Sequence, residues 1–377
     1  MMNKVGIYIH IPFCLSKCLY CDFCSFPHVD EKTKEAYVEA LIREIHSYKG
    51  DLEGYVVDTI YFGGGTPSLL DVSQTARILS AIYEVAHVDS GAEISSEVNP
   101  ATADEGKLLA WRELGINRLS VGVQSFIDEE LRALGRRHTA EEAEAFIQMA
   151  RRCGFDNLSL DLMYAIPHQT KESFATSLAR AISLNPTHVS AYSLKVEEGT
   201  PFANMGDALI LPDEDEEVAL YEMCVDTLER AGYCQYEISN YAKVGYESRH
   251  NLRYWEMRPY IGIGVAAYSY FHNRRYGCDR DLSAYLDRTF SGVPKEVEPN
   301  DRKTQMYETV MLGLRLNRGI ADKDFRDIFG VGFYETYQEK IDPLIGSGLL
   351  TYDGNVTALT PRGMYVSLAI LSHILTE

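Results

Sequence analysis

The sequence predicts an α/β fold, in which a parallel sheet covered by helices precedes a smaller, mostly helical domain. Two observations predict it. Up to about residue 235, six short β-rich runs alternate with longer segments of helical spacing. From about residue 301 the pattern is mainly helical and ends in a hairpin and a last helix. Six strand–helix units are fewer than the eight of a closed barrel, so an open partial barrel and a doubly wound sheet both fit.

The six predicted strands are rich in β-branched and aromatic residues. They are GIYIHI (6–11), VVDTIYFGG (56–64), AEISSEV (92–98), NRLSVGVQ (117–124), NLSLDLMYAI (157–166) and HVSAYSL (188–194). In either architecture the loops at the carboxyl ends of the strands carry the chemistry.

The predicted helices lie between these strands. They cover residues 30–48, 73–86, 102–114 and 172–184, and an acidic-fronted helix in 211–233 closes the repeating part. Thr102 and Glu105 have the spacing of a capping box. The pattern divides the chain into a sheet domain (1–235), a Tyr- and Gly-rich connection (236–300) and a winged-helix-like C-terminal domain (301–377), whose hairpin turns at Asp353-Gly354.

Charge and hydropathy exclude two classes of function. A formal charge of −19 without a dense Lys/Arg stripe argues against nucleic acid as a partner. No apolar run reaches the roughly 18 residues that span a bilayer, and the first residues lack a secretion signal. We therefore expect a cytoplasmic protein, and in that reducing compartment clustered cysteines indicate metal or redox chemistry.

Four of the eight cysteines lie between positions 14 and 24, directly after the first strand. Cys14, Cys18 and Cys21 form a C-x3-C-x2-C motif, and three thiolates can hold three irons of a [4Fe–4S] cluster while the fourth iron stays open. The alternative is a zinc site, with Cys24, His10 or His28 as the fourth ligand. The spacing is unusual for zinc, and no second C-x2-C pair follows.

Polar residues also lie at or just past the ends of successive predicted strands, where they are costly if buried without partners. They are Gly64, Gly65 and Thr66 in GGGTP, Glu97 in EVNP, Gln124 in GVQSF, Arg136 in LGRRH and Asp161 in DLMYAIP. Each one alone could be a cap or a loop residue. Together they indicate a common polar ligand.

The cysteine motif after YIHIPF resembles that of the radical S-adenosylmethionine superfamily, which implies an open partial (β/α)6 barrel. The resemblance further implies a [4Fe–4S] cluster whose open iron binds S-adenosylmethionine. The remaining motifs resemble the HemN/HemW group of radical enzymes and haem chaperones over essentially the whole chain. By this resemblance, Tyr8, Gly64 and Glu97 contact the cluster-bound S-adenosylmethionine. Gly65, Thr66, Gln124, Arg136 and Asp161 match a second S-adenosylmethionine site, which leaves one or two molecules per chain.

Tyr20 and Phe23 flank Cys21 and could pack against an adenine ring, although simple loop packing explains them equally. Phe23 also stands where the oxygen-independent coproporphyrinogen III oxidases have a further Cys, and Cys14 follows only thirteen residues, whereas those oxidases have a long preceding segment. Both departures favour the haem-chaperone branch of the group.

HNLRYW, residues 250–255, matches the H-N-x-x-Y-W motif of that branch. The match implies haem as cargo, held by His250, Asn251, Tyr254 and Trp255, because a neutral imidazole with a free nitrogen can ligate haem iron beside aromatic rings. Without the resemblance, His250 would be interpreted as a hydrogen-bonded core residue.

The resemblance therefore implies a haem chaperone that passes haem to acceptors such as respiratory haem proteins, with peripheral contact to membrane proteins. The alternatives are oxidative decarboxylation of coproporphyrinogen III and, more weakly, a radical methyltransferase or a haem-degrading relative. Catalytic residues, cleavage of S-adenosylmethionine and the oligomeric state stay open.

Overall fold

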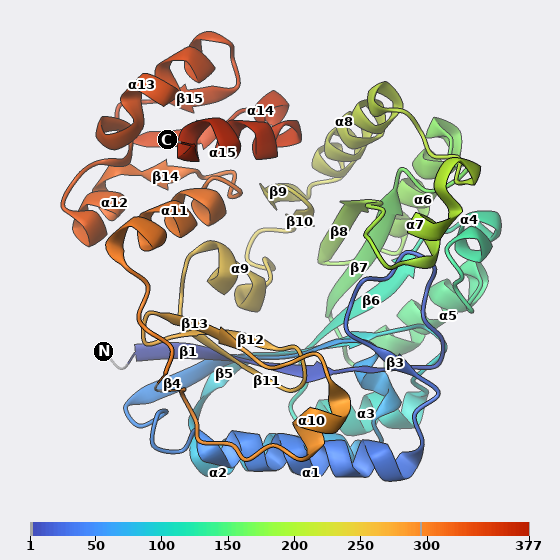
Figure 1. The fold of residues 1–377 in the computed structure, drawn as a ribbon. Helices are drawn as coiled ribbons and strands as arrows, with labels where there is room; N and C mark the ends of the chain where they lie inside the picture. The colour runs from blue at the N-terminus through green and yellow to red at the C-terminus, as the bar shows by residue number, and fades with distance from the viewer. Residues whose placement is uncertain (1–2, 295, 377) are drawn as a thin grey trace.

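The computed structural model describes residues 3–294 and 296–376, and a large curved sheet dominates it (Figure 1). Within these residues the sheet has eleven strands in the order β13-β12-β11-β1-β4-β5-β6-β7-β8-β10-β9. Its centre is six parallel strands: β1 (Asn3–Ile11), β4 (Tyr55–Gly64), β5 (His87–Val98), β6 (Arg118–Gln124), β7 (Asn157–Tyr164) and β8 (His188–Ser193). Each coincides with a predicted strand, and the predicted α/β class with an open six-unit barrel is confirmed.

The segment 236–300 contributes to both edges of this sheet. β11 (Tyr260–Ile263) runs parallel to β1 and is followed by antiparallel β12 (Tyr268–Phe271) and β13 (Arg274–Gly277). At the other edge, β10 (Asn240–Ala242) pairs antiparallel with β8, and β9 (Cys234–Glu237) pairs antiparallel with β10. A separate short pair, β2 (Phe13–Cys14) and β3 (Phe26–Pro27), holds the two ends of the cysteine loop together.

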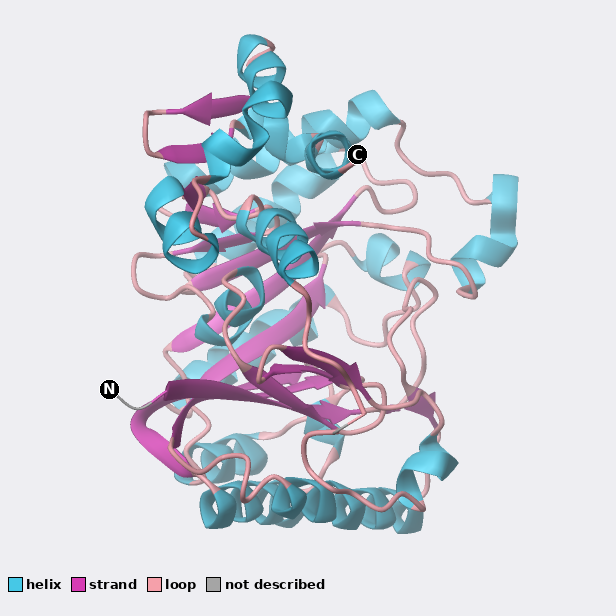
Figure 2. Cartoon of the chain, turned by 60° about the vertical axis from the view of Figure 1, so that its left-hand side comes forward, coloured by secondary structure: helices cyan, strands magenta, loops and turns pink. Residues whose placement is uncertain are grey.

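Helices cover the convex face of the sheet (Figures 1 and 2). They are α1 (Glu31–Ser47), α2 (Val72–Val85), α3 (Glu105–Glu113), α4 (Asp128–Ala133), α5 (Ala140–Arg152), α6 (Lys171–Ser183) and α8 (Glu214–Arg230). The 3-10 turn η1 (Pro67–Leu69) follows β4, and α7 (Pro201–Met205) and η2 (Gly206–Ala208) lie in the connection after β8, where α7 contacts the cysteine loop. The predicted capping box at Thr102 and Glu105 is wrong. Asp104 caps α3 by accepting from the Lys107 N–H, while Thr102 donates its hydroxyl to the Asn99 carbonyl.

Two further helices belong to the 236–300 segment. α9 (Arg249–Trp255), which carries HNLRYW, lies in the concave interior of the sheet, and α10 (Leu282–Leu286) lies beside α1 (Figure 1). No helix among the described residues is long and apolar enough to cross a membrane.

The C-terminal part combines helices with a small antiparallel sheet of order β14-β16-β15. Its elements are α11 (Arg302–Gly313), β14 (Ile320–Ala321), α12 (Asp322–Phe329), α13 (Phe333–Gly346), β15 (Leu350–Tyr352), β16 (Val356–Leu359), α14 (Pro361–Tyr365) and α15 (Ser367–Leu375). The hairpin predicted at Asp353-Gly354 is present, and Gly354 supplies the positive φ that its turn requires.

The two faces of the central strands differ sharply. On β6, the apolar side chains of Leu119, Val121 and Val123 are fully buried under the outer helices. The alternate residues, Arg118, Ser120 and Gln124, belong to the opposite, concave face because side chains alternate along a strand. The fold therefore surrounds a polar interior, which we call the lumen.

Candidate functional site

The cysteine loop crosses the carboxyl end of the sheet beside residues of three central strands. Cys14, Cys18 and Cys21 are reduced and half-buried, and they interact electrostatically with one another. Burial is the main cause that raises the pKa of the Cys14 and Cys21 thiols. The Thr66 hydroxyl donates to Cys14 Sγ at 3.7 Å, and Arg136 Nη1 donates to Cys18 Sγ at 3.6 Å.

The donor set fits a cluster better than a zinc ion. His10 has both ring nitrogens occupied: Nδ1 lies 3.0 Å from the Tyr8 hydroxyl and Nε2 lies 2.9 Å from the Cys24 carbonyl oxygen. The Cys24 thiol donates to the Arg280 carbonyl. Within residues 3–294 and 296–376, no three His, Cys, Asp or Glu side chains converge on a point as one metal ion requires. A cubane cluster binds each cysteine through a different iron, which spreads the thiolates apart.

The glycine run at the end of β4 packs against the end of β1 and the start of β2. Gly64 has φ of +113°, and a Cβ there would lie 2.5 Å from the His10 ring. A Cβ on Gly65 would lie 2.7 Å from the Phe13 carbonyl oxygen. Close packing therefore requires glycine at both positions.

Glu97, at the end of β5, lies at the centre of the candidate S-adenosylmethionine site. Its Oε2 accepts the Gly64 N–H at 3.0 Å, and its Oε1 accepts the Tyr61 hydroxyl at 3.0 Å. Burial, together with the nearby Asp161 carboxylate, raises the pKa of Glu97 to about 7. Near neutral pH this group can therefore hold or release a proton at the position where the family resemblance places a cationic cofactor.

The raised pKa of Glu97 predicts a pH effect on stability. Between its ordinary pKa of 4.5 and about 7 the folded chain binds more protons than the unfolded chain, so this group lowers stability as pH rises through that range. We expect Glu97→Gln to gain in unfolding free energy relative to wild type from about pH 5 to 7.5, and the gain to level off above. Urea unfolding across this range measures it. Glu129→Gln, at an exposed site on α4, controls for the change in net charge. If the difference in unfolding free energy between Glu97→Gln and wild type did not change with pH, the raised pKa of Glu97 would be contradicted.

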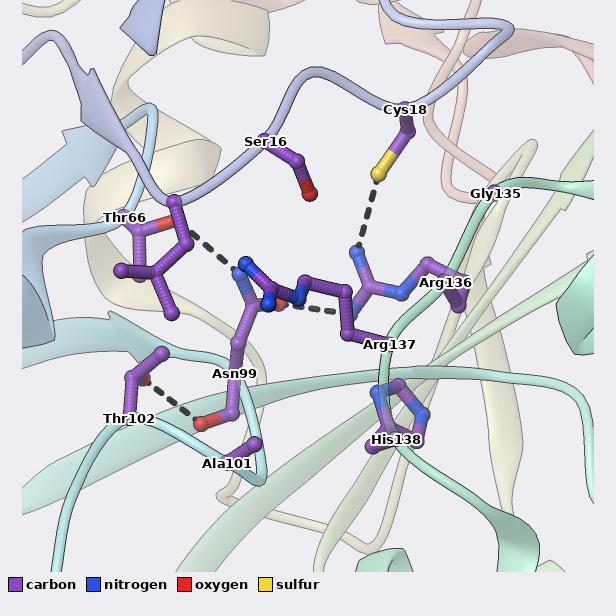
Figure 3. Close-up of a pocket in the computed structure, with 11 residues that line it drawn as sticks. Ser16, Cys18, Thr66, Asn99, Ala101, Thr102, Gly135, Arg136, Arg137 and His138 are labelled. Atoms are coloured by element: carbon purple, nitrogen blue, oxygen red, sulfur yellow. Dashed lines mark hydrogen bonds between the residues drawn. The ribbon is translucent and has the colours of Figure 1, made fainter. Parts of the chain in front are cut away.

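Asn99 connects the two halves of the site, and the sequence interpretation missed it. Its Nδ2 donates to Thr66 Oγ1 at 3.0 Å, and its Oδ1 accepts from Arg136 Nη2 at 2.6 Å. Arg136 Nη2 also donates to the Gly122 carbonyl at 2.5 Å. Figure 3 shows this series of hydrogen bonds, which runs from Thr66 through Asn99 and Arg136 to Cys18 along a pocket. The pocket is also lined by Leu15, Ser16, Ala101, Thr102, Gly135, Arg137 and His138. Asn99 lies within the EVNP motif, and that position could have indicated it.

The other predicted residues lie in different surroundings. Gln124 ends β6 with a φ of +69°, and Asp161 accepts from the Ser120 hydroxyl at 3.1 Å, with its pKa raised by burial. Tyr20 is packed beside Arg136, and burial raises the pKa of its hydroxyl. Phe23 is 66% exposed. The structure thus brings Tyr20 to the site and leaves the Phe23 ring in solvent.

The HNLRYW helix is anchored in the lumen. His250 has no exposed surface; its Nδ1 lies 2.9 Å from Thr59 Oγ1 and its Nε2 lies 2.9 Å from the Tyr254 hydroxyl. Its ring stacks on Tyr61 with centroids 5.3 Å apart. Burial lowers the pKa of His250 to about 3, so the ring is neutral. Neither ring nitrogen is free as haem ligation requires, and the role as haem ligand stays a prediction that needs the Tyr254 bond to open.

The other members of the motif connect α9 to its surroundings. Arg253 is buried, donates to Thr59 Oγ1 at 3.0 Å and pairs with Asp58. Trp255 packs beneath the Arg315 guanidinium at 4.4 Å. Asn251 is half-buried, and its backbone N–H donates to the Ser248 hydroxyl at the helix start.

Known proteins resemble this chain over its whole length. Residues 8–181 match the Radical SAM superfamily and residues 300–366 match the HemN C-terminal domain. Three proteins named haem chaperone HemW are each 34% identical to this chain. The one from Lactococcus lactis matches 98% of this chain and 97% of its own length, the one from Bacillus subtilis 98% and 99%, and the one from Escherichia coli 100% and 99%. The chain belongs to the HemW family.

This membership confirms the resemblance to the radical S-adenosylmethionine superfamily and to the HemN/HemW group. The superfamily implies a [4Fe–4S] cluster and S-adenosylmethionine as cofactors. Among solved structures, coproporphyrinogen III oxidase (HemN) from Escherichia coli superposes with a TM-score of 0.85 at 26% identity, over 99% of this chain and 90% of that one. This chain thus shares its fold with that oxidase over 90% of the oxidase chain.

Proposed function

We propose that this chain is a haem chaperone that binds one haem and delivers it to haem-protein acceptors, among them respiratory ones. The observation that carries the proposal is the full-length similarity to relatives named haem chaperone HemW. Phe23, which stands where the oxidases have a further cysteine, separates the chain from that branch of the group.

The cysteine loop would hold the cluster through Cys14, Cys18 and Cys21, and a cluster bound there would supply an electron to S-adenosylmethionine. Glu97 accepts the Tyr61 hydroxyl and the Gly64 N–H, and with Tyr8 nearby these groups form a polar cradle that positions the cofactor. Arg136 and Asn99 hold the loop through Cys18 and Thr66. The protein's own contribution is to bind and orient.

We propose one S-adenosylmethionine per chain, because only the first site offers the open iron of a cluster, whereas the charged residues of the second site, Arg136 and Asp161, mostly have partners within the protein; Arg136 Nε lacks one among the described residues. Arg136 donates to Cys18, Asn99 and the Gly122 carbonyl, and Asp161 accepts from Ser120. Anaerobic equilibrium dialysis of cluster-loaded protein counts the bound molecules. One per chain is expected, and two would contradict the proposal.

Haem binding tests the chaperone function directly. We expect cluster-loaded protein, titrated anaerobically with haem, to show saturable one-to-one binding in its Soret absorption. Parallel incubation with coproporphyrinogen III and S-adenosylmethionine should yield no protoporphyrinogen IX. Formation of 5′-deoxyadenosine in proportion to porphyrinogen consumed, without haem binding, would instead make the chain an oxidase. Formation of S-adenosylhomocysteine would indicate a methyltransferase.

A further inference from the structure

The lumen contains an arginine to which the site described above assigns no role. Arg118 begins β6 and belongs to the same face as Ser120. The strand register places it opposite Ser95 of β5, and Ser95 lies opposite Tyr61 of β4, which lies opposite Tyr8 of β1. Arg118 and Ser95 are therefore in the same row of the concave face as two tyrosines beside Glu97.

Three polar atoms of this pair have no hydrogen-bond partner among the described residues. Arg118 is 1% exposed, and its Nε and Nη1 lack a hydrogen-bond partner in the part of the chain that the structure describes. The Ser95 hydroxyl, fully buried, likewise has none there. An unpaired buried guanidinium costs free energy, so such a group in a folded protein indicates a missing partner.

The nearby carboxylates are engaged elsewhere. Glu93 is next to Arg118 electrostatically, but its two oxygens accept the backbone N–H groups of Arg249 and His250 at the start of α9. Asp161 accepts from Ser120. The unpaired donors of Arg118 thus stay available to a ligand, and the acids already near them make a monoanion such as a carboxylate a better acceptor than a phosphate dianion.

Tyrosines surround this position. Arg118 interacts electrostatically with Tyr61 and Tyr236. Tyr192, on β8, is 40% exposed, yet burial raises the pKa of its hydroxyl, as expected for a side chain in a concave interior. Tyrosine rings near a guanidinium suit a planar, apolar ligand that carries a carboxylate at its edge.

We propose that Arg118 and Ser95 form a carboxylate-binding subsite of the lumen. The inference rests on the proposed function, because the carboxylates which that function brings to the chain are the propionates of haem and the methionine carboxylate of S-adenosylmethionine. Both offer the same chemistry to a guanidinium and a hydroxyl, and the experiment separates them.

The test compares two porphyrins and one cofactor. Four cluster-loaded proteins are titrated anaerobically: wild type, Arg118→Met, Arg118→Lys and Ser95→Ala. The three ligands are haem, haem dimethyl ester, whose propionates are esterified, and S-adenosylmethionine. If the subsite takes a propionate, wild type binds haem more tightly than the ester. Arg118→Met then lowers the affinity for haem about tenfold and leaves the affinity for the ester unchanged. If the subsite takes the methionine carboxylate, Arg118→Met lowers the affinity for S-adenosylmethionine about tenfold and leaves the affinity for both porphyrins unchanged.

Arg274→Met is the matched control, because Arg274 also has a buried, unpartnered Nε but lies on β13 at the far edge of the sheet. It should bind all three ligands as wild type does. Unchanged affinity of Arg118→Met for every ligand would overturn the subsite. If the Met variant does not fold, Arg118→Lys and Ser95→Ala decide, and equal affinities to wild type in both overturn it. If wild type binds no haem, the proposed function fails, and the S-adenosylmethionine arm alone then decides the subsite.

Discussion

Alanine at Cys14, Cys18 or Cys21 is expected to abolish iron–sulfur cluster assembly, whereas alanine at Cys24 is expected to leave it intact. Each of the first three thiols would supply the only protein ligand of one iron, so its loss uncovers a second iron. Cys24 lies in the same loop, but its thiol donates to the Arg280 carbonyl. Iron and sulfide analysis after anaerobic reconstitution, with the visible absorption spectrum, measures the effect.

The Cys24→Ala variant is the control for this experiment, because it removes a thiol from the same loop. Loss of iron in Cys24→Ala would mean that the fourth cysteine is a ligand. Stoichiometric zinc with no sulfide in wild type would contradict the cluster itself. His10 is hydrogen-bonded to the Tyr8 hydroxyl and to the Cys24 carbonyl oxygen. We therefore expect His10→Ala to loosen the cysteine loop without removing a ligand of the cluster.

His250→Ala is expected to lower the free energy of unfolding by about 3 kcal/mol or more. The substitution empties a fully buried position and leaves the Thr59 and Tyr254 hydroxyls without their imidazole partner. It also removes the ring that stacks on Tyr61. Urea unfolding monitored by circular dichroism measures the loss.

The same residue predicts an acid effect. The pKa of His250 is about 3 in the folded chain, below its ordinary value of 6.5, so between these values the unfolded chain binds the additional proton. Stability contributed by the neutral ring is therefore present above about pH 6.5 and is lost as pH falls towards 3. His250→Gln, which keeps hydrogen-bonding capacity, should show a flatter acid limb than wild type.

His87→Ala is the matched control, because His87 is exposed at the start of β5; its change should stay within about 0.5 kcal/mol. An equally small loss at His250 would contradict the anchoring role. Haem titration of folded His250→Gln then addresses the second role. An unchanged Soret spectrum would exclude His250 as the iron ligand, and a changed one would support ligation by His250, which requires its hydrogen bond to Tyr254 to open.

Local patterns were sufficient for the elements and for the family. The alternation of strands and helices is written in short stretches of sequence, because strand and helix periodicities depend on neighbouring residues. The cysteine spacing and the strand-end motifs are equally local. A capping pattern was less reliable: Thr102 had the right spacing, yet Asp104, two residues later, is the cap.

Contacts between distant residues were decided only by the tertiary structure. Asn99 joins Thr66 to Arg136, and the sequence contains no periodicity that pairs them. Arg118 could have been noticed as a charge within an apolar strand, but only the assembled lumen shows that its Nε and Nη1 have no hydrogen-bond partner among the described residues.

The sequence by itself determined the strand–helix order, the cysteine motif and membership of the HemW family. The tertiary structure decided that HNLRYW forms a buried helix in the lumen, with His250 held by Thr59 and Tyr254 and its backbone N–H held by Glu93. Thr59 and Glu93 lie more than 150 positions before His250. Burial and hydrogen bonding between such distant residues arise only when the sheet curves around the helix, and they decide whether an imidazole nitrogen is free to bind iron.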